Sequence, residues 1–256
     1  MSLAYTENWD SDTPPALTAG WNTSSAVIVT QATYAYSSPN ALSSNASTSG
    51  IVVATYGSGD GSGSGSFTVT LYGICSFNSG TPLSPGHYAG IVFRGSASTL
   101  NTTNTTWYYA VANHNLDPED FDYFIFGKMV NGVNTTISSV QLTGSFSTNG
   151  WYKIYLSMNG DGTSSNNITL QVTRLSDNYT LNSGGSWASG TNTVVSSTDT
   201  SILTGQYYGI YLQSPKANDA VVDDWGINTL GAGSSHIFIP LDGLRITSNL
   251  SGGIFG

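Results

Sequence analysis

Charged residues are scarce in this sequence, and basic residues are the scarcest. Of its 256 residues only 8% are Asp, Glu, Lys or Arg, and 6 Lys plus Arg stand against 15 Asp plus Glu, for a formal net charge of -9. Proteins that bind nucleic acid or anionic lipid neutralise phosphates with clustered Lys and Arg. We therefore expect neither nucleic acid nor a membrane as a partner, and we expect the partners to be neutral.

Cysteine and long apolar runs are also nearly absent. The single cysteine, Cys75, lies in the alternating run SFTVTLYGICSF, so no disulfide forms within the chain and we expect Cys75 to be a small buried hydrophobe. No apolar run approaches the ~18 residues that cross a bilayer. The opening MSLAYTENWDSDTPP lacks a positive segment followed by an apolar one, so no export signal is predicted.

Short segments rich in Val, Ile, Tyr, Phe, Trp and Thr, separated by Gly, Asn, Ser and Pro, dominate the rest of the chain. This pattern predicts strands, and no window has the 3.6-residue period of a helix. The predicted strands are residues 26–31, 50–56, 66–77, 87–94, 106–114, 121–130, 151–158, 167–175, 206–213 and 220–227. This number of strands is too large for one twisted sheet. We therefore expect an all-β protein with two packed antiparallel sheets in a sandwich.

The segment WYKIYLSM shows the alternation of a strand with one dry face. One side of this strand is apolar and carries Tyr152, Ile154, Leu156 and Met158. The opposite side carries Trp151, Lys153, Tyr155 and Ser157. The second side therefore presents two aromatic rings beside a positive charge.

The composition changes after the last predicted strand, which divides the chain into a β-sandwich domain at 1–230 and an extended C-terminal arm at 231–256. A Gly/Ser-rich hinge opens the arm, and apolar residues are spaced along the remainder. These anchors are Ile237, Phe238, Ile239, Leu241, Leu244, Ile254 and Phe255. Such an arm docks either onto a neighbouring subunit or back onto its own domain, and the sequence leaves both open.

Three stretches carry a resemblance to a known superfamily. The opening TENWDSDTPPALTAGW, the middle GWYKIYLSMNG with NITLQVTRL, and the close GQYYGIYLQSPKANDAVVDDWGI together resemble concanavalin A-like (LamG-type) jelly-roll domains over residues 4–230. The resemblance implies that an N-terminal segment and a C-terminal strand pair in one sheet. The superfamily holds lectins, carbohydrate-binding modules, glycoside hydrolases, polysaccharide lyases and phage surface proteins, so it indicates a fold more than a function.

The catalytic patterns of those enzymes are missing. Retaining glycosidases need two carboxyls about 5 Å apart, which the resemblance would place in an E-x-D-x-x-E motif, yet the only glutamates are Glu7 and Glu119. The Gln-x-His motif of the related lyases is absent. His87, His114 and His236 have no G-x-S-x-G partner, so we expect structural or surface histidines and a protein that is not an enzyme.

The segment HNLDPEDFDYF gathers acidic residues beside His114. Its carboxylates are Asp117, Glu119, Asp120 and Asp122. The pattern fits a solvated acidic loop, a calcium site or, less simply, catalytic carboxyls, and these interpretations stay open.

The resemblance suggests a second place for calcium, where the N-terminal segment meets the closing strand. The candidate ligands there are Glu7, Asp10, Asp223 and Asp224. Carboxylates suit calcium, although Asp223 and Asp224 would point to opposite faces of a strand unless a bulge intervened. The alternative is carboxylates bonded to loop amides. Structural Ca²⁺ is thus the only cofactor suggested, and none is required.

Sugar binding needs aromatic platforms and amide or guanidinium groups on the concave sheet, because pyranose C–H faces stack on rings while hydroxyls need polar partners. The candidates are Arg94, Trp107, Tyr109, Asn113, Tyr123 and Tyr211. The competing interpretation is that most of these rings belong to the core.

The surface-type composition, with many Ser, Thr, Asn and Gly, is typical of an extracellular protein, yet no export signal is predicted. A virion protein, made in the host cytoplasm and exposed on the particle, reconciles the two. We therefore expect a non-enzymatic virion structural protein, a capsid decoration or tail-fibre component, that contacts neighbouring virion subunits or copies of itself and has affinity for glycans. The alternatives are a free extracellular lectin or carbohydrate-binding module and, third, a polysaccharide hydrolase or lyase.

Overall fold

The computed structural model describes residues 4–13, 17, 19–23, 28–31, 35–37, 39–44, 48–57, 67–78, 87–115, 121–160, 164–214 and 219–231. Strands, turns and bends make up this part of the chain, and none of it is helical. Accordingly, the described residues contain no helix long and apolar enough to span a membrane. The predicted arm lies outside them beyond Gly231, so the division into domain and arm stays a prediction.

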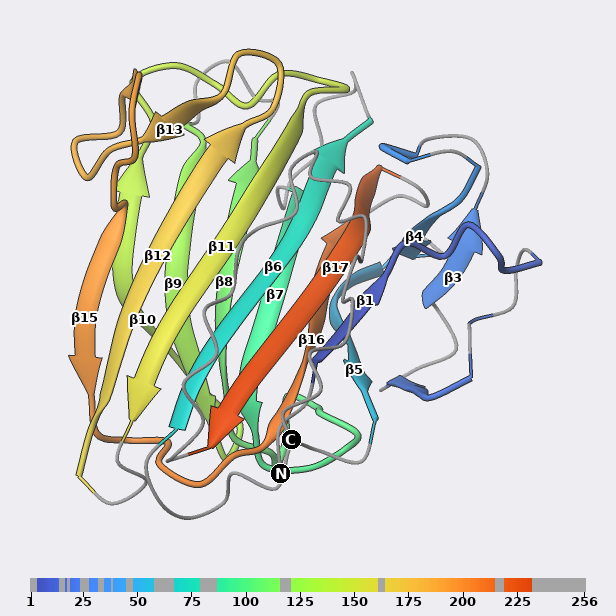
Figure 1. Cartoon of the computed structure of the whole chain (residues 1–256), viewed down its shortest axis with the longest axis vertical. Helices are drawn as coiled ribbons and strands as arrows, with labels where there is room; N and C mark the ends of the chain where they lie inside the picture. The colour runs from blue at the N-terminus through green and yellow to red at the C-terminus, as the bar shows by residue number, and fades with distance from the viewer. Residues whose placement is uncertain are drawn as a thin grey trace, which may run out of the picture.

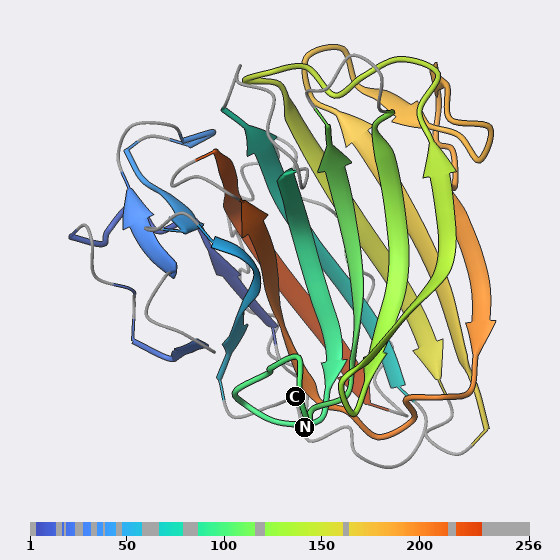
Figure 2. The ribbon, with the colours of Figure 1, turned by 180° about the vertical axis from the view of Figure 1, so that it is seen from behind.

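Two antiparallel sheets pack face to face (Figures 1 and 2). The ten-stranded sheet faces the viewer in Figure 1. Its main path runs in the order β14 (Trp187–Ala188), β13 (Tyr179–Leu181), β12 (Asn166–Arg174), β11 (Trp151–Gly160), β6 (Phe67–Phe77), β17 (Ala220–Gly231), β4 (Ala41–Ser44) and β3 (Ile28–Gln31). Off this path, β1 (Ala4–Glu7) pairs with β17, and β15 (Val195–Asp199) pairs with β12.

The seven-stranded sheet lies toward the viewer in Figure 2. Its order is β10 (Val133–Gln141), β9 (Tyr123–Val130), β8 (Trp107–His114), β7 (His87–Gly95), β16 (Tyr207–Ser214), β5 (Thr48–Tyr56) and β2 (Trp21–Thr23). Sequential strands β7 to β10 form a meander, whereas β16 and β5 come from distant parts of the chain. The predicted all-β sandwich of two antiparallel sheets is confirmed.

The alternation in the sequence builds the core between the sheets. On β11 the even-numbered side chains from Tyr152 to Met158 are fully buried, while Trp151, Lys153 and Tyr155 are half-exposed on the outer face. Cys75 on β6 is fully buried, as predicted, and burial raises the pKa of its thiol to about 12. The interior is therefore an apolar layer, with a protonated Cys75 as one of its small members.

Strand β8 breaks this pattern, because each of its residues is buried. Its even-numbered residues join the main core, while Trp107, Tyr109 and Val111 join a second apolar cluster. That second cluster lies on the outer face of the seven-stranded sheet. Central strands buried on both faces are unusual in an antiparallel sandwich, and they direct attention to this outer face.

The two ends of the described chain meet as the resemblance implied. Strand β1 pairs with β17 in the register Ala4↔Asn228 to Glu7↔Trp225. The Trp225 indole packs edge-on against Trp21 at 5.1 Å between centroids and donates a hydrogen bond of 3.1 Å to the carbonyl of Gly209. Because Gly209 belongs to the other sheet, this contact ties the layers together at the closing strand.

Candidate functional site

Three of the predicted sugar-binding rings come together on the outer face of the seven-stranded sheet. The ring centroids of Trp107 and Tyr109 are 5.7 Å apart, those of Trp107 and Tyr211 are 6.0 Å apart, and those of Tyr109 and Tyr211 are 5.6 Å apart. Their exposed fractions are only 0%, 5% and 4%, respectively. The predicted neighbourhood exists, but these rings form a closed apolar floor and offer no stacking surface to a ligand.

A glycine on the next strand lets this floor close. A Cβ at Gly127 would lie 2.3 Å from the hydroxyl oxygen of Tyr109, so the tyrosine ring lies directly across β9. The Tyr109 hydroxyl then donates to Asn134 Oδ1 on β10 at 2.7 Å. At the same end, Trp107 Nε1 donates to the carbonyl of Asn101 at 3.1 Å. The polar atoms of both rings are thus bonded within the protein.

The opposite end of the same face is polar. The pairings Gln213↔Tyr88, Tyr88↔Asn113, Asn113↔Tyr123 and Tyr123↔Gln141 place one residue from each of five strands side by side. We call these five residues the polar row. Tyr88, Tyr123 and Gln213 are half-exposed and Gln141 is exposed, so the row is open to solvent where the floor is closed.

Asn113 is the centre of the polar row and its least exposed member, at 7%. Its Oδ1 is buried and has no hydrogen-bond partner among the described residues. Beside it, the Tyr211 hydroxyl donates to Gln213 Oε1 at 3.0 Å, and burial raises the pKa of the Tyr88 phenol. A buried amide oxygen without a partner is rare, and here it belongs to a residue that is paired across the sheet with two tyrosines.

The structure separates Arg94 from this face, so its predicted place on the sugar-binding surface is wrong. The side chain is fully buried, its guanidinium carbon lies 4.1 Å from the centroid of the Phe67 ring in the main core, and it donates to the carbonyl of Leu203. Arg94 has a φ of 55° at the irregular end of β7. This local break in the strand alternation turns the side chain inward, which no periodicity in the sequence revealed.

Asp122 is a structural residue of the interior, so for this residue the solvated-loop and metal-ligand interpretations are wrong. Its side chain is fully buried, with Oδ2 3.0 Å from His114 Nδ1, and Oδ1 accepts the backbone N–H of Asn115 at 2.6 Å. Oδ2 also accepts the backbone N–H of Phe146. Both oxygens are thus bonded to hydrogen-bond donors. The other carboxylates of that segment, Asp117, Glu119 and Asp120, lie outside the described residues.

The histidines that the structure describes are buried. His114 bonds Asp122 and packs on Phe77 at 5.2 Å between centroids. His87 Nδ1 lies 3.0 Å from Ser214 Oγ. Both have the structural role that we expected, and His236 lies outside the described residues.

At the junction of the termini, Glu7 and Asp10 hold the turn that follows β1. Glu7 Oε1 accepts the backbone N–H groups of Asn8 at 3.1 Å and Trp9 at 3.0 Å, while Oε2 accepts the Tyr5 hydroxyl at 2.5 Å. Asp10 accepts the side-chain amide of Asn8 at 2.8 Å and the backbone N–H of Asn40 at 3.3 Å. Glu7 Oε1 in particular accepts its hydrogen bonds from the neighbouring backbone.

A β-bulge lies at Asp223 and Asp224. Such a bulge was the condition for both side chains to point to the same side of the strand. The register of β17 shifts between Asp223 and Trp225, and Asp224 has a φ of 48°. Ser37 Oγ lies 3.1 Å from Asp224 Oδ1 and 3.4 Å from Asp223 Oδ1, so the two carboxylates do share one side. Asp223 Oδ2 accepts the backbone N–H groups of Tyr36 and Ser37 at 2.7 and 2.8 Å.

Burial raises the pKa of Asp223 to about 7, although three backbone N–H bonds oppose the shift. Burial also raises the pKa of Asp224, with Asp10 adding to the increase and Lys153 reducing it. Among the described residues, no three His, Cys, Asp or Glu side chains are arranged to hold a metal ion. The four predicted ligands are therefore not gathered into one such cluster, and calcium at this junction stays a prediction.

Sequence reasoning missed Tyr88, Gln213 and Gln141, which complete the polar row. The segment HYAGIVFR did signal a strand, and alternation places Tyr88 on the face opposite Ala89 and Ile91. The missing information was the strand pairing. The pairing of β7 with β8 joins Tyr88 to Asn113, 25 positions away, and the pairing of β16 with β7 joins Tyr88 to Gln213, 125 positions away.

Comparisons with known proteins found similarity at the level of structure. No family model and no curated protein matches the sequence. The exoplasmic/lumenal domain of VIP36, in its Ca²⁺/Man2-bound form, superposes with a TM-score of 0.51 at 10% identity, covering 92% of this chain and 89% of that domain. A xylan β-1,4-xylosidase from Bacillus halodurans C-125 superposes with a TM-score of 0.51 at 11% identity. That match covers 87% of this chain but only 38% of the xylosidase.

Both matches cover most of the sandwich, and both have low sequence identity, so they bear on the fold alone. They are consistent with the sandwich of two antiparallel sheets described above. The chain has the concanavalin A-like jelly-roll fold.

Proposed function

We propose that this protein is a non-catalytic carbohydrate-binding protein whose sugar site is the polar row. One observation carries the proposal: the buried Oδ1 of Asn113 has no partner among the described residues, and Asn113 is paired across the sheet with the half-exposed Tyr88 and Tyr123. Leaving such an acceptor unbonded costs about 1–3 kcal/mol. A ligand that donates a hydrogen bond there would recover that cost.

The neighbours of Asn113 favour a sugar as that donor. Tyr88 and Tyr123 can cover the C–H face of a pyranose ring, while Gln213 and Gln141 offer amides to its hydroxyls. The row itself contains no charged residue, and the chain has a net charge of -9, so a neutral glycan fits better than an acidic one. The VIP36 domain, which shares the fold, is described in a mannobiose-bound form.

Three carboxylates in the described part of the chain have structural partners, which supports a non-catalytic role. Glu7, Asp122 and Asp223 each accept backbone N–H bonds and hold turns or strand ends. A catalytic acid or nucleophile must instead present an oxygen to the substrate. We therefore propose binding without bond cleavage.

The test is the affinity of Asn113→Ala for neutral glycans, first found with the wild-type protein on a glycan array and then measured by calorimetry. Losing one buried hydrogen-bond partner and the centre of the row is expected to weaken Kd roughly tenfold. Asn104→Ala is the matched control, since Asn104 is an exposed amide in a turn at the other end of the sheet. Unchanged affinity of Asn113→Ala, or no glycan binding by the wild type, would contradict the proposal.

We further propose that the protein works on a virion surface, held there by residues 231–256. Support comes from the sequence alone: a surface rich in Ser, Thr and Asn, and apolar anchors beyond the Gly/Ser hinge. A chain ending at Gly231, the last residue of β17, is expected to keep the sandwich and lose oligomerisation or particle binding in sedimentation. Unaltered sedimentation of the shortened chain would refute the assembly role.

A further inference from the structure

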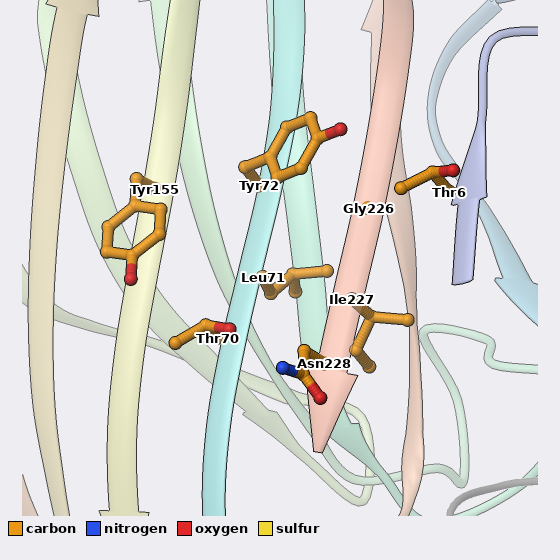
Figure 3. A pocket seen from close by; sticks show the side chains of 8 residues that line it. All are labelled: Thr6, Thr70, Leu71, Tyr72, Tyr155, Gly226, Ile227 and Asn228. Atoms are coloured by element: carbon orange, nitrogen blue, oxygen red, sulfur yellow. The ribbon is translucent and has the colours of Figure 1, made fainter. Parts of the chain in front are cut away.

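The outer face of the ten-stranded sheet carries a small, shallow hollow, on the sheet opposite the one that holds the polar row. Strands β1, β6, β11 and β17 line it. Its residues are Thr6, Thr70, Leu71, Tyr72, Tyr155, Gly226, Ile227 and Asn228. Figure 3 shows the rings of Tyr72 and Tyr155 on neighbouring strands, with the hydroxyl of Thr70 and the amide of Asn228 beside them.

A glycine shapes the hollow. A Cβ at Gly226 would lie 2.4 Å from Cε1 of Tyr72, so the tyrosine ring extends over β17 in space that only glycine leaves free. Tyr155 is the direct cross-strand partner of Tyr72. Both rings are half-exposed, in contrast to the closed floor formed by Trp107 and Tyr211. The pair therefore presents an accessible aromatic platform.

The side chains that line the hollow are uncharged, although the ammonium of Lys153 lies over the ring of Tyr72. No Asp, Glu, Lys or Arg lines the hollow, and the nearby ammonium of Lys153 lies 4.6 Å from the centroid of the Tyr72 ring, where a cation–π contact holds it. Thr70, Asn228 and Thr6 supply two hydroxyls and an amide. Rings with hydroxyl and amide donors and acceptors match the C–H face and hydroxyls of a neutral sugar.

We propose that this hollow is a second site for neutral polysaccharide, so that one molecule binds two glycan chains and cross-links them. The inference rests on the proposed glycan binding at the polar row. The polar row and the hollow lie on the outer faces of different sheets, on opposite sides of the sandwich (Figures 1 and 2). Two such sites that face away from each other cannot both be reached by a short oligosaccharide. They can hold separate polymer chains, which increases the avidity for a polysaccharide surface.

The experiment combines a binding assay with a cross-linking assay on soluble mannan, xylan, β-glucan and galactan. Affinity electrophoresis reports binding, and light scattering of the mixed solution reports cross-linking. Tyr72→Ala and Tyr155→Ala each remove one ring of the platform. Asn228→Ala removes the amide beside it with little risk to folding. Asn113→Ala disables the polar row. Tyr179→Ala is the matched control, because Tyr179 is an exposed tyrosine on the same sheet outside the hollow. Thermal melting checks that each variant is folded.

We expect the wild type and Tyr179→Ala to bind and cross-link one polymer. Tyr72→Ala should bind this polymer roughly tenfold more weakly and should no longer cross-link it. Asn113→Ala should also lose cross-linking, while its intact hollow still binds one polymer chain. Cross-linking by folded Tyr72→Ala, Tyr155→Ala and Asn228→Ala at the wild-type level would overturn the second site and leave the polar row intact. Full binding by Asn113→Ala with loss in Tyr72→Ala would instead overturn the polar row. No binding to any polymer would overturn both.

Discussion

Replacing Asp122 with alanine is expected to lower the free energy of unfolding by about 3–5 kcal/mol. The carboxylate is fully buried and accepts the backbone N–H groups of Asn115 and Phe146 while it pairs with His114. Alanine would leave two buried N–H donors and one ring nitrogen without this acceptor. Because these donors come from the end of β8 and from the segment after β10, the loss would loosen both places at once.

Urea denaturation at neutral pH measures this change. The control is Asp177→Ala, since Asp177 is exposed and pairs only with Arg174 and its own turn; its midpoint should stay close to that of the wild type. Equal midpoints for Asp122→Ala and Asp177→Ala would show that Asp122 does not have the structural role assigned to it. Asp122→Asn should fall in between, because the amide keeps the size and one acceptor.

The free energy of unfolding is expected to fall as the pH rises from about 4 to about 7. Burial raises the pKa of Asp223 to about 7, from 3.8 in the unfolded chain. Below pH 3.8 both states are protonated and the contribution of Asp223 is fully present. Between the two pKa values the unfolded chain releases its proton first, so stability decreases by up to about 4 kcal/mol. The raised pKa of Asp224 acts in the same direction.

The measurement is a series of urea titrations from pH 4 to pH 8 for the wild type and Asp223→Asn. The variant cannot ionise at this position, so its stability should change less over this window. Asp177→Asn is the control: pairing with Arg174 lowers the pKa of Asp177, so its contribution to stability is constant above about pH 4 and is lost only at lower pH. If the wild-type stability is flat or rises across the window, Asp223 is ionised in the folded protein at all these pH values.

The strands that the sequence revealed were those with one apolar side or continuous apolar character. Each of the predicted segments corresponds to a strand, from β3 to β17. Strand β10 was missed because VNTTISSVQ is almost entirely polar, as an edge strand exposed to solvent permits. A signal for it did exist: Asn131 and Gly132, with φ of 48° and 84°, form the two-residue turn that joins β9 to β10.

The candidate site was predictable only in part. Trp107, Tyr109, Asn113, Tyr123 and Tyr211 were assigned to one face, and the pairings of β8, β9 and β16 place them there. Their exposure was not predictable, since an alternating strand has the same pattern whether its second face is open or covered. The result is a closed floor of three rings and an open polar row around Asn113.

Local composition determined the fold class of this protein: alternating β-rich segments specify a two-sheet sandwich, because period-two patterning needs only one apolar face to form a core. Tertiary structure decided what those segments do. The bulges turn Arg94 into the core and bring Asp223 and Asp224 to one side. The register between distant strands places Asn113 beside Tyr88 and Tyr72 beside Tyr155. Bulges and register depend on pairing between residues far apart in the chain, so no local pattern encodes them.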